Sequence, residues 1–152
     1  MTNAIHVVRP GLQTTVQDLG RWGFQAAGVP VAGPMDFFSH RLANLLVGNP
    51  VSAALLEITL LGPELEFDAP ATIAVCGAEF DIIAGGSGMP MATSVHVDRG
   101  TRLQFGRRRS GARAYLAVAG GVQTPPVLGS RATHIVSAMG GLHGRALAAG
   151  TE

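Results

Sequence analysis

The sequence contains no lysine, so all 11 of its basic residues are arginines. A lysine Schiff base, a phosphate-loop lysine and covalent attachment of biotin to this chain are therefore excluded, since each needs a lysine amine. Charged residues make up only 14% of the chain and hydrophobic residues 47%, and the net charge is +1. So small a net charge argues against nucleic-acid binding, and so few charges lead us to expect that partner subunits cover part of the surface.

Cysteine is almost as scarce as lysine, because Cys76 is the only one. No disulfide can form within the chain, which is typical of a reducing, cytoplasmic setting. Cys76 lies in the apolar run 73–76, so we expect a buried apolar residue and not a nucleophile. The five histidines lack metal-ligand spacing, and we expect no metal site. No apolar run approaches the roughly 18 residues of a membrane helix, so we expect neither a membrane span nor a signal peptide.

Short apolar segments recur along the chain and are separated by glycine and proline, which number 21 and 9. This pattern predicts a mainly β protein, either a barrel or a sandwich. Val95 and Val97 alternate with polar neighbours and should face inward, whereas Arg107, Arg108 and Arg109 should occupy a solvated turn. The expected strands cover residues 5–8, 54–61, 65–67, 72–76, 80–84, 94–98, 102–106 and 114–119.

One helix is predicted near residues 35–47. Asp36 suits its N-cap and Gly48 the position just after its end. Phe38, Leu42 and Leu45 or Leu46 recur at helical spacing, which predicts an amphipathic helix with its polar residues facing water.

Four groups of polar residues are candidates for a site. Ser39 and His40 are adjacent and so point about 100° apart on a helix, which excludes them as a nucleophile and base pair, whereas Asp36 and His40 are four apart and can pair. Glu57 either faces water or, if it is buried, requires a partner such as arginine. The run 140–145 offers backbone N–H groups to an anion but lacks the phosphate-loop pattern. The four groups are Thr14 to Asp18 with Arg21; Asp36, Ser39, His40, Arg41 and Asn44; Glu57; and Ser130, Arg131, His143 and Arg145.

Several ordered blocks carry a resemblance to a known family. They are Pro10-Gly11-Leu12-Gln13-Thr14-Thr15-Val16-Gln17-Asp18-Leu19-Gly20-Arg21, Gly33-Pro34-Met35-Asp36, Ser39-His40-Arg41-Leu42-Ala43-Asn44, Glu57-Ile58-Thr59, Ala74-Val75-Cys76-Gly77-Ala78, Tyr115-Leu116-Ala117-Val118-Ala119-Gly120-Gly121, Leu128-Gly129-Ser130-Arg131 and Gly144-Arg145-Ala146-Leu147. Together they resemble the biotin-dependent carboxyltransferase-like family, also called allophanate hydrolase subunit 2. That family includes the C-subunit of 5-oxoprolinase, the carboxyltransferase region of urea carboxylase and the antagonist partner of a sporulation kinase inhibitor.

The resemblance implies a cyclophilin-like, mainly antiparallel β-barrel with the helix near 35–47 on its edge. Residues 1–120 would form the β domain, and residues 121–152 a glycine-rich segment leading to a second half that this sequence lacks. Ala132-Thr133-His134 departs from the family, which tends to have a second small hydroxyl residue there.

The function implied by the resemblance is that of a component of an ATP-dependent 5-oxoprolinase, which opens the lactam of 5-oxoproline to glutamate. ATP would bind on the complex, and the partners would be a subunit-1-like protein and other subunits, with a small amide or lactam as substrate. Two alternatives remain open: carboxyl transfer to urea or another amide from biotin on a separate carrier, and non-catalytic regulation of a subunit-1-like protein. The catalytic candidates are Asp18, Asp36 and His40, and the anion-binding candidates are Arg21, Ser130, Arg131 and Arg145.

Overall fold

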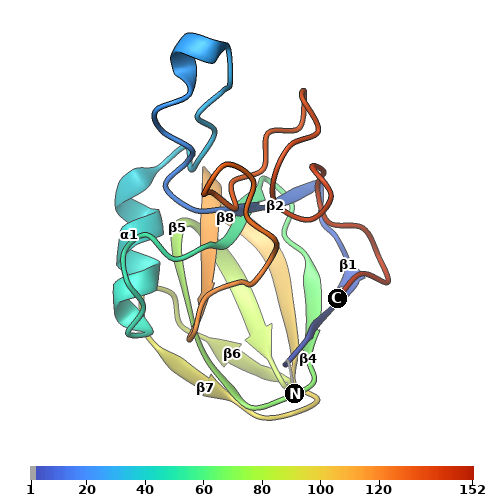
Figure 1. The fold of residues 1–152 in the computed structure, drawn as a ribbon. Coiled ribbons are helices and arrows are strands. Elements are labelled where there is room, and N and C mark those ends of the chain that lie inside the picture. The colour runs from blue at the N-terminus through green and yellow to red at the C-terminus, as the bar shows by residue number, and fades with distance from the viewer. Residues whose placement is uncertain (1–2) are drawn as a thin grey trace.

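Within residues 3–152, which the computed structural model describes, eight strands form one antiparallel sheet that curls into a half-barrel (Figure 1). The main path runs β1-β4-β8-β3-β2, and β5 lies beside β8 and also pairs with β6 and β7. The predicted mainly β class, antiparallel pairing and single principal helix are therefore confirmed. The strands are β1 (Ile5–Arg9), β2 (Gln13–Gln17), β3 (Leu55–Thr59), β4 (Glu64–Phe67), β5 (Ala71–Ala84), β6 (Ser87–Met89), β7 (Val95–Val97) and β8 (Arg102–Val118).

Two long strands, β5 and β8, shape the curl. Each was predicted as two short strands separated at glycine, and that division was wrong. Gly77 has a φ of 100° and marks a bulge in the pairing, where a side chain would collide with the Arg113 carbonyl. Because a glycine bulge bends a strand without ending it, β5 and β8 stay paired while the sheet curls. Arg107, Arg108 and Arg109 are exposed as expected, but they lie within β8 and not on a turn.

The C-terminal segment bridges β1 and β2, the two ends of the main path. The Val7 amide donates to the Thr151 carbonyl over 2.9 Å, and the Gly150 amide donates back to the Val7 carbonyl over 2.8 Å. On the other side the Leu147 amide donates to the Thr14 carbonyl over 2.8 Å. Residues 147–151 thus supply hydrogen-bond partners to strand edges that would otherwise be unpaired.

The sheet has a core on each face. The inner face carries the larger cluster, which includes Leu56, Leu65, Phe67 and Leu116. The outer face is covered by α1 (Phe37–Leu46), whose Ala43 packs with Cys76 and three other buried residues. Cys76 is 2% exposed, which confirms its prediction as a buried apolar residue. No helix in residues 3–152 is long and apolar enough to cross a membrane.

The helix begins where predicted, but it buries polar residues together with only part of its apolar side, namely Leu42 and Leu46. Asp36 is its N-cap and Gly48, with a φ of 77°, follows its end, as expected. The buried residues are Ser39, His40, Ala43 and Asn44, whereas Phe38 is 75% and Leu45 59% exposed. The prediction that polar residues face water was therefore wrong for Ser39, His40 and Asn44. Each of these side chains can be buried because it has a hydrogen-bond partner within the protein.

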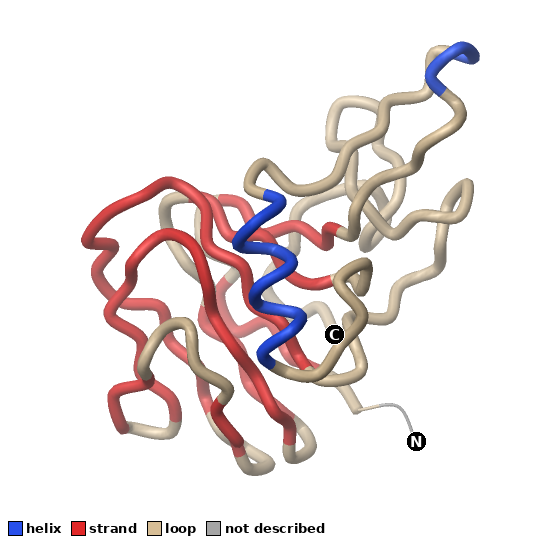
Figure 2. Tube along the Cα trace, turned by 90° about the vertical axis from the view of Figure 1, so that its left-hand side faces the viewer, coloured by secondary structure: helices blue, strands red, loops and turns tan. Residues whose placement is uncertain are grey.

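The remaining strand predictions were mostly confirmed, with shifts of a few residues at the ends. Val97 is buried and Val95 half-buried, as their alternation predicted. Two strands were missed: β2, whose threonines and glutamines were interpreted as a loop, and the short β6. In both views the connecting loops gather at one end of the half-barrel, above β2 and the start of α1 (Figure 2).

Candidate functional site

Asp18, at the end of β2, holds together two segments that are far apart in the sequence. Its carboxylate accepts hydrogen bonds from the Ser130 hydroxyl over 2.5 Å and from the Arg131 amide over 2.6 Å. It also accepts from the Gly20 amide over 2.9 Å, which tightens the turn that follows β2. We call residues 123–133 the clamped loop, because Asp18 fixes its position.

Arg21 lies beneath the clamped loop and is 1% exposed. Its Nε donates to the Val127 carbonyl over 3.2 Å and its Nη2 to the Ala132 carbonyl over 2.6 Å, while Nη1 is buried without a hydrogen-bond partner in residues 3–152. Burial lowers the pKa of Arg21, and the nearby Asp18 charge acts in the opposite direction. Gly140 leaves room for this guanidinium, since a side chain there would collide with Nη2 and with the Ala132 carbonyl.

Arg131 is half-buried and lies across the start of the clamped loop. Its Nε donates to the Thr124 carbonyl over 2.8 Å and its Nη2 to the Gln123 side-chain oxygen over 3.0 Å. Its Nη1 makes no hydrogen bond within the described part of the chain. The guanidinium is thus fixed in orientation with one nitrogen left to meet a ligand.

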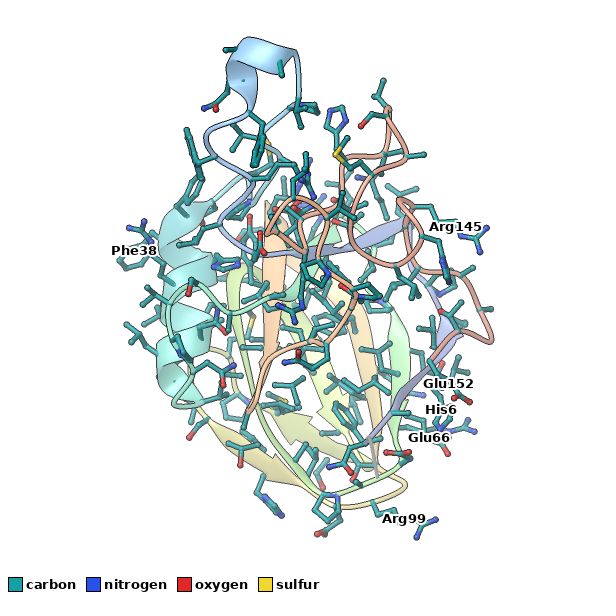
Figure 3. The ribbon with its side chains drawn as sticks, viewed as in Figure 1. His6, Phe38, Glu66, Arg99, Arg145 and Glu152 are labelled. Carbon is teal, nitrogen blue, oxygen red and sulfur yellow. The ribbon has the colours of Figure 1, made fainter. Side chains whose placement is uncertain are left out.

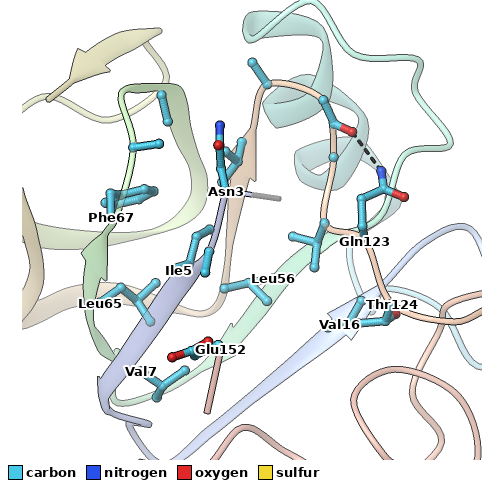
Figure 4. Close-up of a pocket in the computed structure, with 18 of the residues that line it drawn as sticks. Asn3, Ile5, Val7, Val16, Leu56, Leu65, Phe67, Gln123, Thr124 and Glu152 are labelled. Carbon is cyan, nitrogen blue, oxygen red and sulfur yellow. Dashed lines mark hydrogen bonds between the residues drawn. The ribbon is translucent and has the colours of Figure 1, made fainter. Parts of the chain in front are cut away.

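A cavity of about 840 Å³ opens inside the half-barrel and borders the same loop (Figure 4). Gln123 and Thr124, which hold Arg131, both line it. The Thr124 hydroxyl is buried and has no hydrogen-bond partner among residues 3–152. The apolar part of the lining comes from Ile5, Val7, Val16, Leu56, Leu65 and Phe67.

His40 lies below the end of β2 and is fully buried. Its Nε2 is 3.0 Å from the Gln17 carbonyl, which can only accept, so Nε2 carries the proton and Nδ1 is left without a partner in the described structure. Burial lowers the pKa of His40, so the ring is neutral near pH 7. Gln17 extends this layer, since its side-chain nitrogen donates to the Thr133 carbonyl over 3.0 Å and its side-chain oxygen accepts from the Gly33 amide over 3.1 Å.

Asp36 caps α1 and does not pair with His40, so that predicted pairing was wrong. Its carboxylate accepts from both the amide and the hydroxyl of Ser39. Burial raises the pKa of Asp36, but the hydrogen bonds from Ser39 and the Phe38 amide outweigh it and the net pKa is lowered. The carboxylate is therefore ionised, and its negative charge is favourable at the N-terminus of a helix.

Glu57, on β3, proved to be buried and paired, which was one of the two alternatives. Its Oε2 accepts from the Tyr115 hydroxyl and from the Met35 amide, both over 2.8 Å, and its Oε1 lies 3.7 Å from Arg113 Nε. The Tyr115 hydroxyl in turn accepts from the Asp36 amide over 2.8 Å. Burial, and then the charge of Glu57, raises the pKa of Tyr115, so this network stays protonated at the phenol and ties the start of α1 to the sheet.

The glycine run at 140–145 does not offer the backbone N–H groups of Gly141, Gly144 and Arg145 to an anion. The amides of Gly141, Gly144 and Arg145 already donate to the carbonyls of Arg131, Gly140 and Leu142. Gly141 and Gly144 serve close packing, since a side chain would collide with Thr133 at the first and with Ala138 at the second. Arg145 is exposed and points away from the molecule on the side of β1 (Figure 3).

The structure thus brings together four of the seven predicted residues: Asp18, Arg21, Ser130 and Arg131. His40 lies one layer deeper, Asp36 is at the helix start and Arg145 stands apart. Sequence reasoning missed Gln123 and Thr124, which nothing in their local pattern distinguishes from an ordinary loop. No group of three or more metal-ligating side chains occurs in the described residues.

Comparisons with known proteins agree with one another. A family model for the carboxyltransferase domain, subdomain A and B, matches residues 27–152. Urea amidolyase of Saccharomyces cerevisiae is 41% identical over 148 residues, which is 97% of this chain and 8% of the yeast protein. The C-subunit of 5-oxoprolinase from Escherichia coli is 41% identical over 143 residues, 94% of this chain and 46% of the bacterial protein.

Solved structures give the same result. The crystal structure of Kluyveromyces lactis urea carboxylase superposes with a TM-score of 0.95 at 43% identity, covering 97% of this chain and 13% of that one. The chain therefore spans less than half of the bacterial 5-oxoprolinase protein and a small part of the fused urea enzymes.

Proposed function

Because this chain belongs to the carboxyltransferase subdomain A and B family, we propose that it forms part of the substrate site of a multi-subunit enzyme acting on a small amide. The first candidate reaction is the ATP-dependent opening of the 5-oxoproline lactam to glutamate. The second is carboxyl transfer from carboxybiotin to urea or another amide. Lactam opening develops negative charge on the oxygen of the attacked carbonyl. Carboxyl transfer breaks the bond between the biotin nitrogen and its carboxylate and forms one at an amide nitrogen, so both reactions handle an anionic group that a well-placed cationic or N–H donor would stabilise.

The observation that carries the proposal is that two residues of the cavity lining hold the Arg131 guanidinium. Gln123 and Thr124 line the cavity and also fix the Arg131 guanidinium. We place the anionic group of the substrate at Arg131 Nη1, which makes no hydrogen bond within residues 3–152 while Nε and Nη2 are held. Charged donors of this kind make the stronger class of hydrogen bond.

We assign the other residues to positioning. Asp18 and Ser130 hold the clamped loop, and Arg21 supports it from below through two carbonyls. His40 and Asp36 position α1, because His40 joins it to β2 through the Gln17 carbonyl and Asp36 caps its first turn through Ser39. Arg145 is left as a contact for a partner or for an anion that approaches from the outer surface.

The cofactors belong to the rest of the assembly in this proposal. Three amides of the glycine run already donate to carbonyls of the protein and the run lacks the phosphate-loop pattern, so we place ATP on a partner subunit. With no lysine in this chain, biotin would come on a separate carrier. A cytoplasmic setting, where ATP is available, completes the proposal.

The test is a reconstituted assembly of this chain with its subunit-1-like and ATP-dependent partner subunits. We expect glutamate and ADP to form when 5-oxoproline is supplied, and no bicarbonate to be consumed. Bicarbonate-dependent carboxylation of urea by an assembly with a biotin carboxylase and carrier would establish the second candidate, which the match to K. lactis urea carboxylase favours. A tight complex that turns over neither substrate would overturn both and leave the regulatory alternative.

A further inference from the structure

The outer face of α1 presents an apolar surface without a partner in residues 3–152. Phe38 and Leu45 are seven residues apart and so lie on one side of the helix, with exposures of 75% and 59%. Met35, just before the helix, is 73% exposed, and Phe37 is 38% exposed. Figure 3 shows Phe38 pointing away from the molecule on this side. We call these four residues the helix patch.

The helix patch exists because α1 turns several of its polar residues toward the protein. Its polar residues face the protein, where His40 meets the Gln17 carbonyl and Asn44 donates to the Ala53 carbonyl over 2.9 Å. Phe38 and Leu45 are then left outside, whereas Leu42 and Leu46 still pack against the outer-face cluster. A large aromatic side chain gains nothing from an outward position in an isolated chain, so another surface must supply the burial.

The charge around the helix patch indicates what kind of surface covers it. From Trp22 to Leu56 the only charged residues are Asp36, which is used as the helix cap, and Arg41. Arg41 lies 5.9 Å above the Phe37 ring, at the edge of the helix patch. Aromatic residues, methionine and arginine with few other charges are the composition of a protein interface core.

Other occupants fit less well. A two-fold contact with a second copy would place two Arg41 side chains near one another with no free carboxylate between them. A membrane-surface helix needs several basic residues along its polar face, but here that face is buried and holds none. The convex face of a helix also suits a protein groove better than it suits a small ligand.

We propose that the helix patch docks into an apolar groove of a partner subunit that places a carboxylate opposite Arg41. This inference rests on the proposed function for its partner, the subunit-1-like protein of the same enzyme. The loop that leads into α1 (Figure 1) also carries Trp22, which is 62% exposed.

The experiment is calorimetric titration of the full chain with the purified subunit-1-like protein. Phe38→Ser, Leu45→Ser and Arg41→Glu should each weaken binding by about tenfold or more, as central interface residues do. Val136→Ser, at a residue that is 92% exposed elsewhere, and Arg99→Glu should leave affinity within about twofold. All variants should keep the wild-type Tm, because every altered side chain is exposed.

Three results would overturn the inference: no binding by the wild-type chain, equal binding by the helix-patch variants, or a wild-type homodimer that Phe38→Ser dissolves. Turnover by the assembly separates this failure from that of the proposed function. If helix-patch variants lose binding while the wild-type assembly forms neither glutamate nor carboxylated urea, the docking surface stands and the proposed function fails. If the wild-type assembly turns over and the variants bind equally, only the docking surface fails.

Discussion

Replacing Asp18 with alanine tests how the clamped loop is held. The change removes three acceptor contacts, to the Gly20 amide, the Ser130 hydroxyl and the Arg131 amide. Two of these join residues more than a hundred positions apart, so their loss frees the loop from β2. Asp98→Ala is the matched control, since it also removes one carboxylate but from a side chain that is 91% exposed.

The expected magnitude follows from the three hydrogen bonds. Asp18 is half-buried, so we use the value of an ordinary hydrogen bond, about 1 kcal/mol each, and give no extra weight to its charge. The free energy of unfolding should fall by about 3 kcal/mol, which for a domain of this size corresponds to a drop in Tm of about 6 to 12 °C. The protein should remain folded, since total stabilities are about 5–15 kcal/mol.

Urea unfolding and hydrogen exchange provide the assay. Asp18→Ala should lower the urea midpoint and expose the Arg131 amide to exchange, while Asp98→Ala should do neither. Asp18→Asn keeps one oxygen acceptor and should lie between Asp18→Ala and the wild type. A loss no larger than that of Asp98→Ala, with the Arg131 amide still protected, would refute the reasoning.

Three further predictions concern buried groups. The pKa of His40 is lower in the folded chain than its ordinary 6.5, so protonation favours unfolding and stability should be full above about pH 6.5 and fall below it. The slope should approach 1.4 kcal/mol per pH unit and should vanish in His40→Gln; an unchanged slope in that variant would contradict the assignment. Tyr115→Phe leaves Glu57 and the Asp36 amide each without a partner and should cost about 1–3 kcal/mol in urea unfolding, whereas a neutral effect would mean that water replaces the hydroxyl. Burial raises the pKa of Cys76 to about 11, so a disulfide reagent should modify it only after unfolding, and rapid reaction of the native protein would count against its burial.

The sequence was informative wherever local chemistry determined local structure. Asp36 and Gly48 mark the helix because capping depends on neighbouring residues alone. Which side of the helix is buried could not be predicted in the same way. His40 and Asn44 are hydrogen-bonded to the carbonyls of Gln17 and Ala53, which lie outside the helix. Periodicity indicates which residues share a face of the helix. It does not indicate for which face the rest of the protein supplies hydrogen-bond partners.

The strands show the same division. Gly77 looked like a break, and only its pairing with β8 reveals a bulge within one long strand. β2 was missed because its threonines and glutamines lack the apolar alternation of a half-buried strand, although Thr14, Thr15 and Gln17 are all buried. In the site, Asp18 and Arg131 were candidates from motif position, but their connection depends on the pairing of distant segments that a single sequence does not display.

The central claim is that Arg131, which is held by two residues of the cavity lining, contacts the anionic group of the substrate. The most direct measurement is kcat/KM of the reconstituted assembly containing Arg131→Ala, compared with Arg99→Ala, whose side chain lies on the exposed turn beyond β7 (Figure 3). We expect Arg131→Ala to lower kcat/KM by about a hundredfold, as loss of one charged donor does, and Arg131→Lys to recover only part of it. Arg99→Ala should match the wild type. Equal kcat/KM for Arg131→Ala and the wild type would contradict the account.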